Sequence, residues 1–272
     1  MEAVETVEVL LVFTKVQNNR NLQLQLADCL RSMLRYATGS IMEGLDMQPL
    51  GQRIEEELGP VMGHFRASAN SYYGDSLFFL SLIAHRLFPL KNRLLLLDAD
   101  LSFRKDVREL WDEFASFGDS AVLGIAREAQ PVYRHLFHSY RAKHPGTIIG
   151  DPPPHGLSGF NSGVLLLNLH KMRQSSEYNS LLKAEAVKSL ADRYSFRGHL
   201  GDQDFYTLAA TEHPALFHLL GCGWNRQLCT WWERNGSPEI RKVFAEYHRC
   251  FEEVGIYHGN CNTPIPPDLL HI

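Results

Sequence analysis

Two aspartates that follow a run of four leucines are the residues whose spacing most directly indicates chemistry. Residues 94–97 are all leucine, and Asp98 and Asp100 come next. Four consecutive leucines predict a strand buried on both faces, as in a parallel sheet. Alternate residues of an extended chain point the same way, so both carboxylates can converge beyond the carboxyl end of this strand, where open α/β sheets bind ligands. Two carboxylates suit a hard divalent cation that binds phosphate oxygens. The alternative is a pair of solvated loop residues that cap the next helix.

Two glycine-containing segments carry further polar side chains. Gly201-Asp202-Gln203-Asp204 stands at a predicted helix start, where an N-cap would explain the acids but not Gln203 between them. Residues 159–163, Gly-Phe-Asn-Ser-Gly, precede another predicted buried strand and could approach a sugar or diphosphate where larger side chains would clash. Neither a dinucleotide-binding fingerprint nor a P-loop is present in the sequence.

A late histidine could complete a metal site. His258 ends an apolar run and is followed by glycine. A single histidine is more often structural, but His258 beside two carboxylates would make a suitable Mn²⁺ site. Trp224, Trp231 and Trp232 are expected to pack in the core or on the surface, and a few aromatic residues could form a platform for a sugar.

The elements that must position these residues alternate along the chain. Alternating strands and helices without a linker indicate one α/β domain over residues 1–272. Strands are predicted at 7–13, 94–97, 121–126 and 164–167, and helices at 21–36, 52–58, 75–87, 107–114, 175–189, 205–211 and 239–251. Residues 38–60 lack the second strand that such a sheet should have, and residues 131–154 read as a long connection.

Composition excludes several classes of function. The chain has 272 residues, 44% hydrophobic and 21% charged, which is ample for a core. A net charge of −4 argues against a nucleic-acid partner. No run of residues reaches the roughly 18 apolar positions of a membrane span, and the first residues lack the pattern of a signal peptide.

The five cysteines bear on the compartment. Four of them, Cys222, Cys229, Cys250 and Cys261, lie close to the carboxyl end. Their clustering favours two disulfides there, with Cys29 free. Buried thiols and a zinc site are the alternatives, although the spacings are poor for structural zinc. Asn235-Gly236-Ser237 is a glycosylation sequon or an Asn-Gly turn.

Together these motifs resemble, in order and spacing, the retaining glycosyltransferases of the GT-A fold, a family that includes glycogenin and bacterial galactosyltransferases. The resemblance implies a Rossmann-like mixed sheet flanked by helices, with a nucleotide-sugar half at about 1–126 and an acceptor half at about 127–272. It implies that Asp98, Asp100 and His258 bind Mn²⁺, with Mg²⁺ as the alternative, and that Gln203 and Asp202 are catalytic.

Five segments, 131–135, 159–163, 197–205, 224–232 and 257–264, resemble more closely the xyloside α1,3-xylosyltransferases of animals, a branch of that family. This implies transfer from UDP-xylose to the xylose of O-linked xylosyl-glucose on EGF repeats of Notch-like glycoproteins. It also implies a type II membrane protein in the lumen of the endoplasmic reticulum, attached only through an anchor outside this sequence. The implied substrate-binding residues are Phe13, Thr14, Lys15, Asn70, Leu101, Asn161, Ser162, Gly163, His199, Leu200, Asp202, Trp224, Asn225, Gly259 and Asn260.

The resemblance also implies a mechanism. Gln203 would lie at the β face of the sugar, and because an amide is a poor nucleophile, front-side attack with retention is expected. The family has a lysine at the diphosphate, where this chain has residues 260–262, Asn-Cys-Asn. Lys15, Arg104 and Lys105 are therefore candidates for neutralising phosphate. The rival interpretations are another retaining glycosyltransferase that uses a different UDP-sugar, a haloacid-dehalogenase phosphatase, whose Asp-x-Asp motif normally follows the first strand, and a non-catalytic module that binds carbohydrate or EGF repeats.

Overall fold

The computed structural model of the chain describes residues 6–12, 19–36, 47–66 and 74–269. Four predicted substrate-binding residues, Phe13, Thr14, Lys15 and Asn70, lie outside these ranges. None of the helices that the structure describes combines the length and the apolar character needed to cross a membrane.

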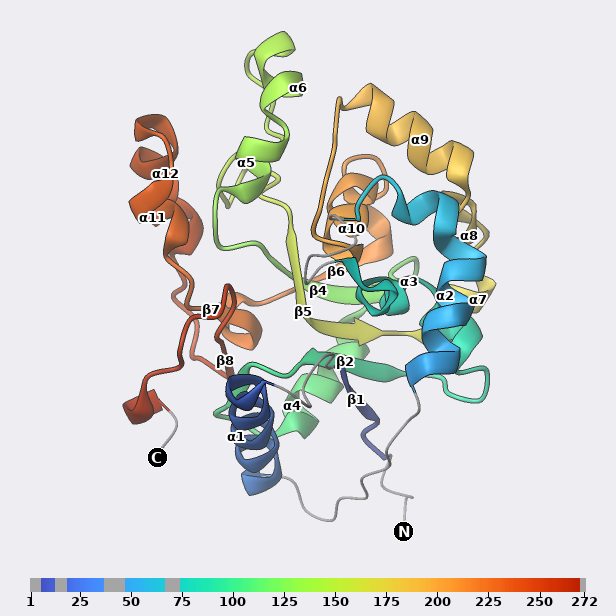
Figure 1. Ribbon diagram of the computed structural model, residues 1–272, viewed down its shortest axis with the longest axis vertical. Coiled ribbons are helices and arrows are strands. Elements are labelled where there is room, and N and C mark those ends of the chain that lie inside the picture. Colours follow the sequence, from blue (N-terminus) through green and yellow to red (C-terminus); the bar gives the residue numbers. More distant parts are fainter. Residues whose placement is uncertain (1–5, 13–18, 37–46, 67–73, 270–272) are drawn as a thin grey trace.

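The central feature is a mixed sheet of five strands (Figure 1). Its order is β1 (Val9–Val12), β2 (Leu94–Asp98), β5 (Phe160–Leu167), β4 (Leu123–Arg127) and β6 (Phe217–Leu220). β2 is parallel to β1 and antiparallel to β5, while β4 is antiparallel to β5 and parallel to β6. The mixed sheet confirms the prediction from the resemblance, and the four leucines are not in an all-parallel sheet.

The leucines of β2 are buried on both faces, as their sequence predicted. Leu94 and Leu96 pack into one hydrophobic cluster, and Leu95 and Leu97 pack into a second cluster on the opposite face. Alternation along the strand thus divides the run between two cores. The end of β2 is held between β1 and β5, which fixes the position of Asp98.

Helices cover both faces of this sheet. The larger cluster is covered by α2 (Met47–Met62), α3 (Leu80–Leu87), α7 (Leu169–Gln174), α8 (Ser176–Leu181), α9 (Ala184–Arg193) and α10 (Asp202–Ala210). The opposite face is covered by α1 (Arg20–Tyr36) and α4 (Val107–Asp112). Figure 1 shows two further pairs standing above the sheet, namely α5 (Val132–Leu136) with α6 (His138–Lys143), and α11 (Trp231–Asn235) with α12 (Pro238–His248). The 3-10 helices are η3 (Ser76–Phe79), η4 (Glu113–Ser116), η5 (Pro214–Leu216), η6 (Cys222–Asn225) and η7 (Pro267–Leu269).

A second, smaller sheet lies beside the end of β2. It consists of β3 (Leu101–Phe103), β8 (Ile256–His258) and β7 (Arg226–Gln227), in that order. Its strands have two or three residues each, which is too short for a periodic pattern, and only the apolar run ending at His258 pointed to one of them.

Several predicted boundaries change. The part of 38–60 that the structure describes, 47–60, is helical and belongs to α2, so the helix predicted at 52–58 is longer. The helix predicted at 175–189 is two helices, α8 and α9, with a break at 182–183. The connection predicted at 131–154 contains α5 and α6, whose aromatic and basic residues gave no clear helical stripe.

Candidate active site

Asp98, Asp100 and His258 form a cluster that could hold a metal ion. One potential ligand atom from each residue lies within 4.8 Å of the others. His258 Nε2 is 3.3 Å from an Asp100 oxygen and 3.6 Å from an Asp98 oxygen. Two carboxylates and an imidazole nitrogen match the ligand set that was predicted, and they suit Mn²⁺ or a similar divalent ion.

The small sheet explains how a residue so late in the chain reaches the two acids. β3 follows Asp100 directly, and its first residue, Leu101, pairs with His258 on β8. The Gly259 N–H donates to the Asp100 carbonyl oxygen at 2.8 Å. Strand pairing therefore fixes the imidazole beside the Asp-x-Asp turn, and Leu101 and Gly259 contribute backbone contacts to the site.

The electrostatics of the cluster favour a bound cation. Desolvation and the adjacent Asp100 carboxylate raise the pKa of Asp98. Burial acts to lower the pKa of His258, but the Asp100 and Asp98 carboxylates outweigh it and raise that pKa. Two close carboxylates repel each other in the absence of a cation, and a divalent ion removes that repulsion. The chemistry of these donors thus fits a metal.

Gly163 leaves the space that this arrangement needs. A Cβ atom at this position would lie 2.3 Å from His258 Cε1 and 3.0 Å from an Asp98 oxygen. The second glycine of the segment 159–163 therefore permits β5 to run directly behind the metal ligands.

The segment 201–204 begins α10 on the other side of β5. Gly201 has a φ of 72°, and Asp202 starts the helix. The Ser162 and Ser81 hydroxyls donate to the two oxygens of Asp202. Burial raises the pKa of Asp202 to about 6, although these hydrogen bonds act to lower it. The helix start also favours the charged form of Asp202.

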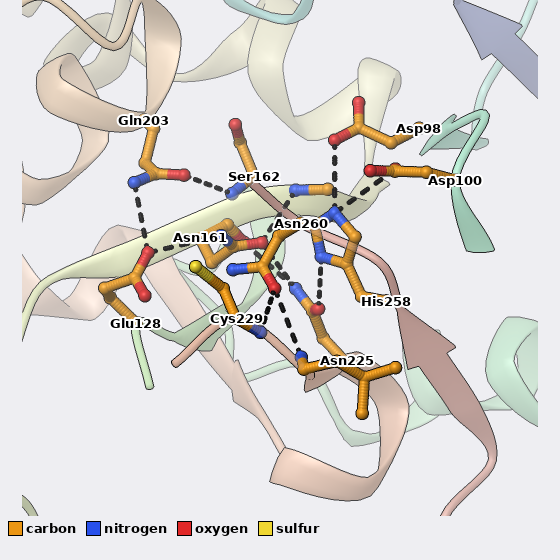
Figure 2. A network of polar contacts seen from close by, with 12 residues as sticks. Asp98, Asp100, Glu128, Asn161, Ser162, Gln203, Asn225, Cys229, His258 and Asn260 are labelled. Atoms are coloured by element: carbon orange, nitrogen blue, oxygen red, sulfur yellow. Dashed lines mark hydrogen bonds and ion pairs between the residues drawn. The ribbon is translucent and has the colours of Figure 1, made fainter. Parts of the chain in front are cut away.

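Gln203 is held at both ends of its amide (Figure 2). Its Oε1 accepts the Ser162 backbone N–H at 3.2 Å, and its Nε2 donates to Glu128 Oε2 at 3.3 Å. Gln203 is 8% exposed. This amide is therefore not a solvated helix-start residue, and its orientation is fixed by two partners.

Glu128 is a buried site residue that the sequence analysis missed. It is 4% exposed, and burial raises its pKa to about 7. Its Oε2 accepts N–H groups from Asn161 and Gln203, while its Oε1 is buried without a partner among the described residues. Glu128 stands just after the strand predicted at 121–126, so the reasoning applied to Asp98 could have found it.

Asn161 and Asn225 connect this carboxylate to the metal cluster. Asn161 Nδ2 donates to Glu128 at 3.2 Å, and Asn225 Nδ2 donates to Asn161 Oδ1 at 2.9 Å. Asn225 Oδ1 is 2.9 Å from His258 Nδ1. The predicted residues Asn161, Asn225 and His258 thus come together in one network.

The other predicted substrate-binding residues lie in varied surroundings. The backbone N–H groups of His199 and Leu200 donate to the Asp204 carboxylate, and Asn260 Oδ1 accepts the N–H groups of Leu228 and Cys229. The Trp224 indole Nε1 donates to Glu113, and Lys105 Nζ lies 5.9 Å from the centre of the Trp224 ring.

The aromatic residues of α11 stand at the surface near α5. Trp231 is 51% exposed, its ring makes an edge contact with Trp232, and the Trp232 ring lies 5.3 Å from that of His135. A sugar platform at these rings stays a prediction.

Both described cations proposed for phosphate have partners elsewhere. Arg104 Nη1 donates to the Leu269 carbonyl oxygen, and Lys105 pairs with Glu253 at 2.7 Å. The third candidate, Lys15, lies outside the described residues.

The cysteine prediction is half right. Cys222 and Cys250 form a disulfide, and Cys29 is a free, buried thiol as expected. The second predicted disulfide is absent, because Cys229 and Cys261 are both free thiols. They lie beside each other, and a hydrogen bond from Cys261 lowers the pKa of Cys229 to about 6.

Comparisons with known proteins agree with this geometry. Residues 22–240 match Glycosyl transferase family 8. The chain is 46% identical to xyloside xylosyltransferase 1 of Homo sapiens over 296 residues, which covers 96% of this chain and 75% of the human protein. The crystal structure of mouse xyloside xylosyltransferase 1 in its apo form matches with a TM-score of 0.90 at 44% identity, over 96% of this chain and 99% of that chain.

A more distant structure shares the fold. The galactosyltransferase LgtC, in complex with donor and acceptor sugar analogues, matches with a TM-score of 0.53 at 17% identity, over 93% of this chain and 85% of that chain. The sheet is therefore that of the GT-A glycosyltransferases, which excludes the dehalogenase-like phosphatase. This chain belongs to glycosyltransferase family 8.

Proposed function

We propose that this enzyme transfers xylose from UDP-xylose to the xylose of O-linked xylosyl-glucose on EGF repeats, and forms an α1,3 linkage with retention. The observation that carries the proposal is the meeting of Asp98, Asp100 and His258 with Gln203 at one edge of the sheet. The 46% identity to human xyloside xylosyltransferase 1 supports the choice of xylose.

Asp98, Asp100 and His258 would hold the divalent cation, Mn²⁺ in this proposal with Mg²⁺ as the alternative. When bound, the ion supplies Lewis-acid stabilisation of the charge that develops on the diphosphate. The chain itself provides the fixed position of the three ligands, through the pairing of β3 with β8.

Gln203 supports the reacting centre rather than attacking it. Its carbonyl oxygen accepts one N–H, from Ser162, and keeps a second lone pair for the electron-poor sugar carbon. The bond from C1 to the phosphate oxygen breaks while the acceptor hydroxyl bonds to C1 on the same face. The acceptor proton passes to the departing phosphate, and because the new bond forms on the face that the phosphate leaves, the α configuration is retained.

Asp202 and Asn161 would hold the hydroxyl groups of the donor sugar. Both are buried, and their side chains are fixed by Ser81, Ser162 and Glu128. Xylose lacks the hydroxymethyl group of glucose, so a close wall at that position would select it. One such group is worth about 1–3 kcal/mol in discrimination.

The partner in this proposal is a Notch-like glycoprotein that carries EGF repeats, and the compartment is the lumen of the endoplasmic reticulum. The disulfide between Cys222 and Cys250 supports an oxidising compartment.

The test is transfer to an EGF repeat that carries xylosyl-glucose. UDP-xylose, UDP-glucose, UDP-galactose and UDP-N-acetylglucosamine would be compared, each with Mn²⁺ and with EDTA. We expect Mn²⁺-dependent transfer of xylose, loss of activity in Asp100→Asn, and normal activity in the exposed control Asp119→Asn. Transfer of another sugar would refute the donor assignment. Binding of the acceptor that is indifferent to Mn²⁺ and UDP, without transfer, would favour the non-catalytic module.

A further inference from the structure

A continuous chain of hydrogen bonds joins Glu128 to the metal cluster through two asparagines. Figure 2 shows it running from Glu128 to Asn161, then to Asn225, and then to His258 beside Asp100. The two links that involve Asn225 are both 2.9 Å long. This series of hydrogen bonds connects two ends of the site that no single helix or strand spans.

This series of hydrogen bonds has a direction, because it starts at an oxygen of Glu128 that accepts two amide N–H groups. Glu128 Oε2 takes an N–H from Asn161, which turns Asn161 Oδ1 toward Asn225. Asn225 therefore donates its Nδ2–H to Asn161 and turns its Oδ1 toward the ring of His258. The imidazole then carries a proton on Nδ1, so that Nε2, the nitrogen that faces Asp98 and Asp100, is the one left to bind a metal.

Two backbone groups support the same direction. The Gly163 N–H donates to Asn161 Oδ1 at 3.2 Å, and Asn225 Nδ2 also reaches the Asn161 carbonyl oxygen, at 3.4 Å. The Gly163 contact is as long as the 3.2 Å link from Asn161 to Glu128, so both groups set the direction of the Asn161 amide.

Burial makes this direction stable. Glu128, Asn161, Asn225 and His258 are all between 2% and 6% exposed. Water has little access to exchange partners with any of them, and a buried amide that turns the wrong way would leave polar atoms unpaired. The same Glu128 oxygen also holds Nε2 of Gln203, so one carboxylate orients two different parts of the site.

We propose that Glu128, Asn161 and Asn225 are a relay that fixes His258 in the tautomer able to bind a metal, while Glu128 also orients Gln203. Glu128 and Asn225 are then positioning residues, and Asn225 acts on the imidazole rather than on the substrate. The inference rests on the proposed function only in requiring a metal at His258. Partners that lie behind a metal-binding histidine typically change metal affinity by about 10–100-fold.

The test is the affinity for Mn²⁺ in the presence of UDP, measured from the electron paramagnetic resonance signal of free Mn²⁺. Glu128→Leu removes the oxygen that accepts from Asn161, so that the Gly163 N–H is left to set the direction of the Asn161 amide and the tautomer of His258 is less firmly fixed. We expect the Kd for Mn²⁺ to rise by about three- to tenfold, which is at or below the low end of that range because Gly163 still favours the original direction.

A second substitution should restore the affinity. In Glu128→Leu/Asn225→Asp, a carboxylate next to His258 Nδ1 accepts its N–H whatever the direction of the Asn161 amide. The Kd should return to within about twofold of the wild type, which a merely structural role of Glu128 would not produce. The control is Asp204→Asn, which neutralises another buried carboxylate on α10 that bonds Tyr133, His199 and Leu200 but not the relay, and should leave the Kd unchanged.

A wild-type Kd in Glu128→Leu, or a double variant no better than the single one, would overturn the relay. If Glu128→Leu does not fold, Asn225→Leu and Asn225→Asp provide the same comparison: weak Mn²⁺ binding in the first and retained binding in the second support the relay, and equal binding refutes it. This readout is independent of the sugar transferred, so failure to transfer xylose with the expected Mn²⁺ pattern would refute the proposed function and leave the relay standing.

Discussion

Gly163→Ala tests the geometry of the metal cluster with one methyl group. The added Cβ would lie 2.3 Å from His258 Cε1, whereas ordinary contact begins at 3.4 Å, so the ring must withdraw by 3.4 − 2.3 = 1.1 Å. Distances between metals and ligands tolerate changes of only about 0.2 Å. His258 is 3% exposed and tied to Asn225, so it cannot move and still bind. We expect the Kd for Mn²⁺ to rise at least about tenfold, or about 1.4 kcal/mol.

The assay is Mn²⁺ titration with UDP present, together with the thermal unfolding of the metal-free protein. Overpacking should also lower the free energy of unfolding by about 1–3 kcal/mol. Gly118→Ala is the control, because a Cβ there meets nothing within 4 Å. Wild-type affinity for Mn²⁺ in a folded Gly163→Ala protein would show that His258 is not a ligand, and the reasoning for the cluster would fail.

Three further predictions concern stability and chemistry away from the metal ligands. Because the pKa of Glu128 is raised to about 7 from an ordinary 4.5, its contribution to stability is fully present below pH 4.5 and is lost as the pH rises through 7. In the metal-free protein, the free energy of unfolding of Glu128→Gln should therefore rise relative to that of the wild type by up to about 3 kcal/mol between pH 4.5 and 8. Parallel profiles of unfolding free energy against pH would contradict this. Alkylation after unfolding without reductant should modify three cysteines by mass spectrometry, whereas a single modified cysteine would show that Cys229 and Cys261 had joined. Gly59→Ala, at a position of α2 directly before Pro60, should fall short of the gain of about 0.5–1 kcal/mol that this change brings in an ordinary helix interior, because the proline ring disfavours a preceding helical residue that carries a Cβ; a full gain in a denaturant titration would contradict this.

Local sequence predicted the helices and strands that have a long pattern of apolar residues and that are buried either on one face or on both. The apolar stripe at 21–36 became α1, and the four leucines became β2 with a core on each face. The acids after β2 and the polar segment before α10 were found because each stands at the end of a strong pattern. Such positions can be located without knowing what lies opposite them.

Pairing between distant short strands could not be predicted in the same way. β3, β7 and β8 have two or three residues each, so neither periodicity nor composition marks them. Their register is nevertheless what brings His258 to Asp100. Only the family resemblance predicted that His258 binds the metal. From the residues alone, this role depended on whether His258 lies near Asp98 and Asp100.

The number of disulfides was wrong for a related reason. Clustering along the sequence correctly indicated that the carboxyl-terminal region is cross-linked, but it carries no information on which thiols are joined. Cys222 and Cys250 connect η6 to the second residue after α12, while Cys229 and Cys261 lie beside each other near Gln130 without a disulfide. Proximity of two thiols is therefore necessary for a disulfide and does not by itself establish one.

Glu128 shows why the polar residues behind a site are harder to find than those that face the ligand. Its sequence context, an acid after a buried strand, is the same as that of Asp98. Glu128 nevertheless accepts hydrogen bonds from two side-chain amides and does not belong to the candidate metal cluster. What distinguishes the two is the neighbour across the sheet edge: β5 presents Asn161 to Glu128 and the bare Gly163 to Asp98. Asn161 and Gly163 are two residues apart on one strand and thus point to the same face. The segment 159–163 therefore places an amide and an empty space side by side, and this alternation separates the metal site from the group that orients it.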